Sequence, residues 1–186
     1  MCVDLATKLL AKQSINSTKI DVLDLAYDKN IVFDSIQNYC KLTCTDITNF
    51  INQETKLLSE GCTLYDPDLD IYIILHNDKD QSHEHLNWTR AHEIGHIYCG
   101  HKKDSRREEI EAHFFAAQLL MPEYTIYQMT KYGSVNTNTI YSLFNVSLTA
   151  ASKRIVTLNK RYSINCGELD KQIWNMMKKN IEQFYK

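Results

Sequence analysis

The sequence predicts an α+β fold that is dominated by helices and contains one small antiparallel sheet. Glycine and proline together account for 7 of the 186 residues, against a usual share of roughly 12%. So few turn-forming residues favour long helices over many short strands. Hydrophobic residues at 44% and charged residues at 24% match an ordinary globular protein. The chain therefore has enough apolar side chains to form a core, and this composition excludes a mainly disordered protein.

The first half of the chain supplies one helix and the expected strands. Residues 1–13 are helix-like, because leucines stand four positions apart. Short β-prone runs follow at residues 31–33, 61–65 and 71–76. Asp66-Pro67-Asp68 lies between the last two runs and consists of turn-forming residues, which predicts a hairpin.

The rest of the chain is expected to be helical. Ser105 and Glu108 have the spacing of a capping box, and Pro122 is a natural helix stop. We divide the chain into a domain over residues 1–135 and a helical C-terminal extension over residues 136–186, packed on the first. The helical patterns cover residues 82–98, 105–121, 123–131, 140–144, 148–158 and 169–184.

Charge and hydropathy restrict the class of protein. The chain carries 21 basic and 23 acidic residues, a net charge of −2, which argues against direct nucleic-acid binding. Residues 140–158 have the rhythm of a helix-turn-helix, but basic side chains are few there, which favours packing or partner docking over DNA reading. These basic residues are Lys153, Arg154, Lys160 and Arg161.

The expected location is the cytoplasm. No apolar run approaches the roughly 20 residues that cross a bilayer. Residues 1–13 lack the uninterrupted apolar stretch of a secretory signal. The six cysteines include no CxxC pair, so we expect reduced thiols and not a disulfide framework.

An HExxH motif, His92-Glu93-Ile94-Gly95-His96, lies on a predicted helix. Two histidines four residues apart face one side of a helix, so both imidazoles can bind the same Zn²⁺. Glu93 lies about 100° round the helix from His92 and is the expected general base. Gly95 inside a helix indicates close packing against a neighbour. The alternative is that the pattern arose by chance in an amphipathic helix.

A catalytic zinc needs a third protein ligand. The metzincin pattern fails, because Gly100 and His101 each fall one place too early. The remaining candidates are carboxylates on the next helix, namely Glu108, Glu109 and Glu111.

We predict Glu111 as that third ligand. On a helical projection Glu111 lies beside an apolar stripe, where a lone carboxylate would need a partner such as a metal. Glu109 points away from this stripe, and Glu108 is a second choice. The alternative for Glu111 is a surface or capping charge early in the helix. The stripe consists of Ile110, Phe114, Ala117 and Met121.

Other side chains gave weaker signals. Cys40 and Cys44 could form half of a metal site, but two buried small side chains explain them better. Histidines near the motif could bind substrate or protonate a leaving amine, although surface histidines are the simpler interpretation; they are His83, His85 and His101. Tyr98 and Tyr132 could stabilise an oxyanion, but nothing in the sequence selects them.

Two segments together resemble the ImmA/IrrE family of metallo-endopeptidases. The first is the HExxH motif at 92–96, and the second runs Glu109-Ile110-Glu111-Ala112-His113-Phe114-Phe115-Ala116-Ala117-Gln118-Leu119-Leu120-Met121-Pro122. The family shows an HE[IL]GH helix and then an E-A-x-x-F-A-x-x-L-L-M-P segment that supplies the third ligand. The likeness extends more loosely over residues 18–160.

The resemblance implies a zincin-like (gluzincin-type) domain with one Zn²⁺ per chain. Its zinc ligands would be His92, His96 and Glu111, and Glu93 would be the catalytic general base. One departure is His113, because relatives commonly carry Asn or Asp there. If that position supports the metal ligands from outside, His113 does so differently or shifts metal affinity.

The implied function is that of a zinc-dependent endopeptidase, a bacterial or phage-borne anti-repressor that cleaves a helix-turn-helix repressor. One alternative is a zinc-containing regulatory module that inactivates a repressor or toxin partner by docking. Another is a DNA-binding regulator that uses residues 140–158. The expected docking surface is residues 136–160, including Lys153 and Arg154, with the C-terminal helix.

Overall fold

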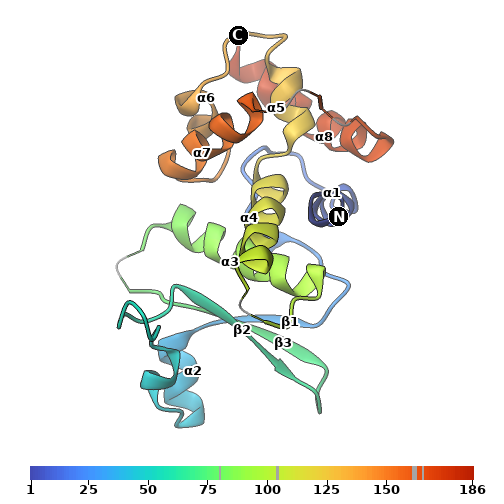
Figure 1. Cartoon of the computed structure of the whole chain (residues 1–186). Coiled ribbons are helices and arrows are strands. Elements are labelled where there is room, and N and C mark those ends of the chain that lie inside the picture. Colours follow the sequence, from blue (N-terminus) through green and yellow to red (C-terminus); the bar gives the residue numbers. More distant parts are fainter. Residues whose placement is uncertain (80, 104, 161–162, 165) are drawn as a thin grey trace.

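A computed structural model describes residues 1–79, 81–103, 105–160, 163–164 and 166–186. It confirms a helix-dominated α+β fold (Figure 1). In chain order the described elements are α1 (Cys2–Ala11), the 3₁₀ turn η1 (Val22–Asp24), β1 (Ile31–Ser35), α2 (Ile36–Thr43), η2 (Ile47–Phe50), β2 (Gly61–Asp66), β3 (Ile71–His76), α3 (His83–Cys99), α4 (Arg106–Leu120), α5 (Glu123–Met129), α6 (Thr137–Leu143), α7 (Leu148–Asn159) and α8 (Glu168–Phe184).

The sheet is mixed, where the sequence analysis expected an antiparallel one. β2 and β3 form the predicted antiparallel hairpin, with Thr63 opposite Ile74. β1 joins the other side of β3 in parallel, with Phe33 opposite Ile74, which gives the order β1-β3-β2. A parallel pair needs a long crossover, so no local turn signal reports this pairing. In this order β2 is an edge strand.

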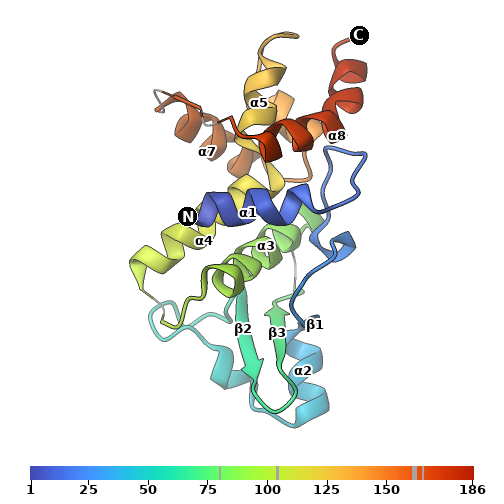
Figure 2. The ribbon, with the colours of Figure 1, turned by 90° about the vertical axis from the view of Figure 1, so that its right-hand side faces the viewer.

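Helices α3 and α4 form layers over one face of the sheet, and α2 lies on the opposite side of the sheet from α3 (Figure 1). α3 packs against β2 and β3, and α4 packs against α3. α1 contacts α3, α4 and α8, and Figure 2 shows it lying over α3 and α4. Helices α5–α8 lie at the end of the molecule opposite the sheet, with α3 and α4 between them (Figure 1). The HExxH helix is therefore held between the sheet and the other helices.

α3 and α4 approach each other closely at Gly95, as its place in a helix indicated. A Cβ added to Gly95 would lie 3.1 Å from the Cα and backbone oxygen of Ala112 and from Cβ of Phe115. These contacts are tighter than ordinary van der Waals contacts, so a larger side chain would push the two helices apart. The glycine thus fixes the distance between the HExxH motif and α4.

The buried face of α4 differs from the predicted one. The capping box of Ser105 and Glu108 is present, and the helix ends before Pro122 as predicted. However, Ile110 from the predicted stripe is 45% exposed. The fully buried side chains follow a different helical row, formed by Ala112, Phe115, Ala116 and Leu119. This row faces α3 because Ala112 is the residue that meets Gly95.

The C-terminal helices share the hydrophobic core with the rest of the chain. One cluster of buried side chains runs from Leu10 in α1 to Ile140 in α6 and to Met177 and Ile181 in α8. The boundary between residues 135 and 136 remains a prediction. Of the basic residues noted in the sequence, Arg161 lies outside the described residues.

Arg154 corrects part of the expected docking surface. It is 3% exposed, and its guanidinium donates hydrogen bonds to the backbone oxygen of Met121 and to Oε1 of Gln118. The side chain therefore ties α7 to the end of α4 and presents no charge to a partner. Lys153, its neighbour, is exposed.

Among the described residues, no helix combines the length and the apolar character needed to cross a membrane.

Candidate metal centre

The two histidines of the HExxH motif point to one place beside α3. Nε2 of His92 lies 3.0 Å from Nε2 of His96. The side chains are 12% and 15% exposed. Burial, assisted by the neighbouring histidines, lowers the pKa of His92 to about 3. The imidazole is therefore neutral at neutral pH, which is the form that binds a metal.

Glu109, and not Glu111, completes this group. Its carboxylate oxygens lie 3.2 Å from Nε2 of His92 and 3.3 Å from Nε2 of His96. These three side chains form the group, within the described residues, whose ligand atoms are close enough to hold a metal ion. Glu109 stands one turn before Ala112, on the face of α4 that meets α3. The predicted apolar stripe is not the face of α4 that meets α3. It pointed to Glu111, whereas the carboxylate at the histidine pair is that of Glu109.

Glu111 is separated from the His92, His96 and Glu109 group by the side chain of His101. Its Oε2 is 3.2 Å from Nε2 of His101, and its Oε1 accepts a hydrogen bond of 3.0 Å from Nε of Arg107. Arg107 foremost, and His101 next, hold the pKa of Glu111 below its usual range. Oε2 of Glu108 accepts hydrogen bonds from the backbone N–H and the hydroxyl of Ser105 in the capping box, so it is not a ligand candidate either.

The donor set suits a zinc ion. Catalytic zinc sites commonly have two imidazoles and one carboxylate, with an open fourth position. Tetrahedral ligands at ~2.0–2.1 Å from the metal lie ~3.3 Å apart. Nε2 of His92 and Nε2 of His96 lie 3.0 Å apart, and each lies 3.2–3.3 Å from a different oxygen of the Glu109 carboxylate. The residues present therefore fit the metal that the sequence motif implies.

Glu93 turns toward the edge strand of the sheet. It is 8% exposed, and the Thr63 hydroxyl in β2 donates a hydrogen bond of 2.7 Å to its Oε2. Gly61 permits this approach, because an added Cβ would lie 2.6 Å from Cγ2 of Thr89 and 3.3 Å from Oε1 of Glu93. Thr63 was not among the residues predicted for the site, because no sequence pattern relates a residue of β2 to a residue of α3.

Two further histidines contact the far side of the His92 and His96 imidazoles. Nδ1 of His101 lies 3.0 Å from Nδ1 of His96. Nδ1 of His113 lies 2.7 Å from Nδ1 of His92. Burial lowers the pKa of His113. The departure noted at position 113 thus lies beside a candidate metal ligand.

The remaining candidates lie in other contacts. His83 pairs with Asp21, and His85 with Glu60, at 2.8 and 3.4 Å. The Tyr98 hydroxyl donates to Oδ1 of Asp28. The Tyr132 hydroxyl donates to Oε1 of Glu182. Cys40 and Cys44 are free thiols.

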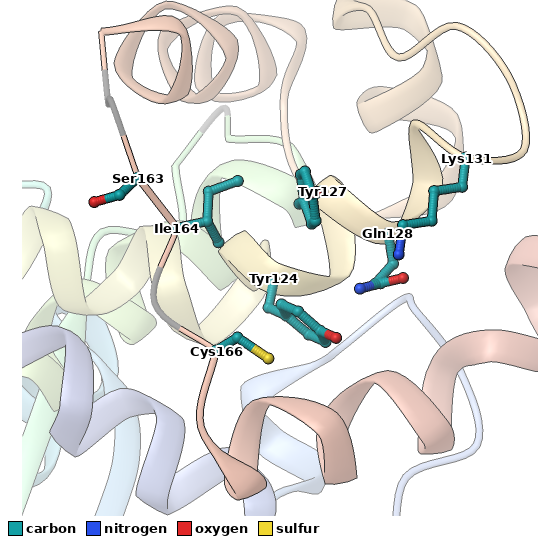
Figure 3. Close-up of a pocket in the computed structure, with 7 residues that line it drawn as sticks. All are labelled: Tyr124, Tyr127, Gln128, Lys131, Ser163, Ile164 and Cys166. Atoms are coloured by element: carbon teal, nitrogen blue, oxygen red, sulfur yellow. The ribbon is translucent and has the colours of Figure 1, made fainter.

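A surface hollow lies apart from the metal centre, between α5 and the segment that precedes α8 (Figure 3). The side chains that line it include none from α3 or α4. They are Tyr124, Tyr127, Gln128, Lys131, Ser163, Ile164 and Cys166. Among the described residues, none that lines this hollow belongs to the candidate metal centre.

A zincin-like metallopeptidase domain is defined by these features together: a small sheet, an HExxH helix packed on it, and a carboxylate from the following helix at the histidine pair. The family model Peptidase M78, described as the IrrE N-terminal-like domain, matches residues 52–156. This is more than half of the chain and includes both motifs, so the protein belongs to that family. No curated protein matches the chain.

Proposed function

We propose that the protein is a zinc-dependent endopeptidase whose zinc ligands are His92, His96 and Glu109. The observation that carries this proposal is that one atom from each of the three side chains lies within 4.8 Å of the other two, beside a buried Glu93. A scaffold that only docks a partner has no need of a general base in this position. The intact Glu93 therefore favours cleavage over the docking alternative.

Each residue has a distinct chemical task. Zinc, when bound, supplies a Lewis acid that polarises a peptide carbonyl and lowers the pKa of water. His92 and His96 provide neutral nitrogen donors, and Glu109 provides a negative charge. Glu93 takes a proton from the attacking water and returns it to the leaving amine. Thr63 holds the Glu93 carboxylate by donating to Oε2.

We further propose that the substrate is a helix-turn-helix repressor, so that the protein acts as a bacterial or phage anti-repressor in the cytoplasm. The resemblance to the ImmA/IrrE family supports this substrate class. A zinc ion and a glutamate recognise only a peptide bond, so selectivity needs further surface. Exposed apolar side chains on α6 and α7 support a docking role there: Tyr141, Leu148 and Val156.

The test is cleavage of a candidate repressor, such as one encoded beside this gene, by wild type and Glu93→Gln. The variant is expected to retain one zinc per chain and its fold, but to lose about 10²–10⁴-fold in cleavage rate, as is typical when a general base is removed. Glu84→Gln is the matched control, because Glu84 begins the same helix but lies outside the metal centre. That control should cleave as fast as wild type.

Three results would each contradict a part of the proposal. A Glu93→Gln protein that cleaves as fast as wild type would show that this carboxylate is not the base. Wild-type protein that binds the repressor and relieves repression without cutting it would establish the docking alternative. Rapid digestion of unrelated proteins such as casein would contradict the proposed selectivity.

A further inference from the structure

A chain of polar contacts leads outward from His96 to the surface of α4. Nδ1 of His96 contacts Nδ1 of His101, and Nε2 of His101 contacts Oε2 of Glu111. Nε of Arg107 then donates to Oε1 of the same carboxylate. The successive distances are 3.0, 3.2 and 3.0 Å, all within hydrogen-bond range.

The protons of this chain can be placed in one consistent way. A histidine that gives its Nε2 lone pair to a metal keeps its proton on Nδ1. Nδ1–H of His96 then donates to Nδ1 of His101, and Nε2–H of His101 donates to Glu111. Arg107 supplies the last donor. Every donor therefore meets an acceptor, with no group left unsatisfied along the path.

The backbone holds His101 in place for this contact. Gly100 ends α3 in the left-handed conformation, with φ of 71°, which a residue without a Cβ adopts at little cost. The backbone N–H of His101 then donates to the oxygen of His96 at 3.0 Å. The His101 side chain is only 5% exposed. A buried, fixed imidazole is a better support than a mobile surface side chain.

A histidine bound to a metal usually donates its other N–H to a carboxylate, a carbonyl or water, and loss of that partner weakens metal binding. Here the carboxylate of Glu111 does not contact His96 directly, because the His101 imidazole lies between them. This series of contacts also joins the end of α3 to α4, the helix that carries Glu109. It can therefore fix the orientation of the His96 imidazole relative to α4.

We propose that His101 is a positioning residue that orients His96 for the metal and that Glu111 acts on the centre through His101. This inference rests on the proposed function, because it assumes that His96 is a zinc ligand. It also gives Glu111, which the sequence suggested as a ligand, a separate structural task two contacts away from His96.

The test measures zinc affinity by competition with a colorimetric chelator. His101→Ala is expected to bind Zn²⁺ about 10–100-fold more weakly than wild type. His101→Gln should recover part of that loss, because its amide oxygen can accept from Nδ1–H of His96. The visible absorption of the Co²⁺-substituted protein should change in His101→Ala, since the His96 ring is no longer held.

The role of Glu111 is tested by combining substitutions. Glu111→Gln alone should weaken zinc binding less than His101→Ala does. In the His101→Ala background it should have no further effect, because the contact that transmits it is gone. His85→Gln is the matched control, since His85 forms a comparable histidine–carboxylate pair with Glu60 near the start of α3. Its zinc affinity should equal that of wild type.

The outcomes separate this inference from the proposed function. Wild type that binds zinc and cleaves, with His101→Ala binding zinc equally well, would overturn the positioning role alone. Wild type that binds no zinc would overturn both. Melting temperatures of the metal-free variants identify any loss of fold. If His101→Ala is unstable, His101→Leu replaces it, because that side chain cannot accept from His96, and a folded His101→Leu protein with wild-type zinc affinity and an unchanged Co²⁺ spectrum would overturn the positioning role.

Discussion

The hydroxyl of Thr63 is placed to control the Glu93 carboxylate. Thr63 lies in the edge strand β2, and it donates to Oε2 of Glu93 across 2.7 Å. This contact exists because Gly61, two residues earlier, lets β2 approach α3 closely. A carboxylate held in one orientation transfers a proton along a defined path, whereas a free one samples several rotamers.

Replacing Thr63 by Val removes this hydrogen bond and keeps the shape of the side chain. Cleavage by Thr63→Val is expected to fall by about tenfold, roughly the value of one charge-assisted hydrogen bond. Zinc affinity should stay unchanged, because Thr63 contacts no candidate ligand in the described structure. Parallel rate and zinc titrations measure the two effects. A loss of zinc binding together with activity would instead indicate a disturbed metal centre.

At the scale of single residues, local spacing predicts only part of the site. His92 and His96 come together because one helix carries both, four positions apart. The choice between Glu109 and Glu111 depends on how α4 is rotated against α3. That rotation follows from the contact between Gly95 and Ala112, which no periodicity within α4 reveals. His101 was noted only as a histidine near the motif and His113 only as a departure from the family pattern, and spacing placed neither beside an imidazole of the motif.

The position of α7 depends on one buried cation. Arg154 donates to the Met121 backbone oxygen, which belongs to the unpaired end of α4, and to Gln118. Gln118 in turn accepts from the Glu123 backbone N–H at the start of α5. The guanidinium therefore connects three helices at the junction between α4 and α5.

Arg154→Ala is expected to lower the free energy of unfolding by about 1–3 kcal/mol for each buried acceptor left without its donor. Lys153→Ala should change it by no more than about 0.5 kcal/mol, because the side chain is exposed. Urea denaturation of both variants measures the difference. Equal stabilities would show that Arg154 has no such anchoring role.

At the scale of elements, the sequence predicted what depends on neighbours in the chain. The hairpin of β2 and β3 and the helices from α3 onward were expected from turn residues, caps and periodicity, and the structure confirms them. The parallel pairing of β1 was not expected. It depends on a partner about 40 residues away, and a strand of five residues carries no signal for that partner.

For the whole molecule, a buried histidine and arginine link the sheet to α3. His76 ends β3, and its Nε2 lies 3.0 Å from Nη2 of Arg90. Both residues are 8% exposed. Burial, and next the positive charge of Arg90, lower the pKa of His76 below its usual value. His76 is therefore neutral in the folded protein at neutral pH.

This pair predicts how stability depends on pH. The unfolded chain takes up a proton at His76 near pH ~6.5, whereas the folded chain does so only at lower pH. The unfolded state thus binds more protons in this window, so the His76 contribution is complete above pH ~6.5 and is lost as pH falls toward the lower folded pKa. Between pH 7.5 and pH 5.5, urea denaturation should show a larger fall in the free energy of unfolding for wild type than for His76→Gln. An equal fall in the two proteins would contradict this.

The central claim is that His92, His96 and Glu109 form a zinc site. Elemental analysis of zinc-loaded, dialysed protein tests it directly. Wild type and Glu111→Gln are expected to hold one zinc per chain, whereas Glu109→Gln should hold far less while keeping its fold by circular dichroism. Retention of zinc by Glu109→Gln with its loss from Glu111→Gln would contradict the assignment, and so would folded wild-type protein that binds no zinc.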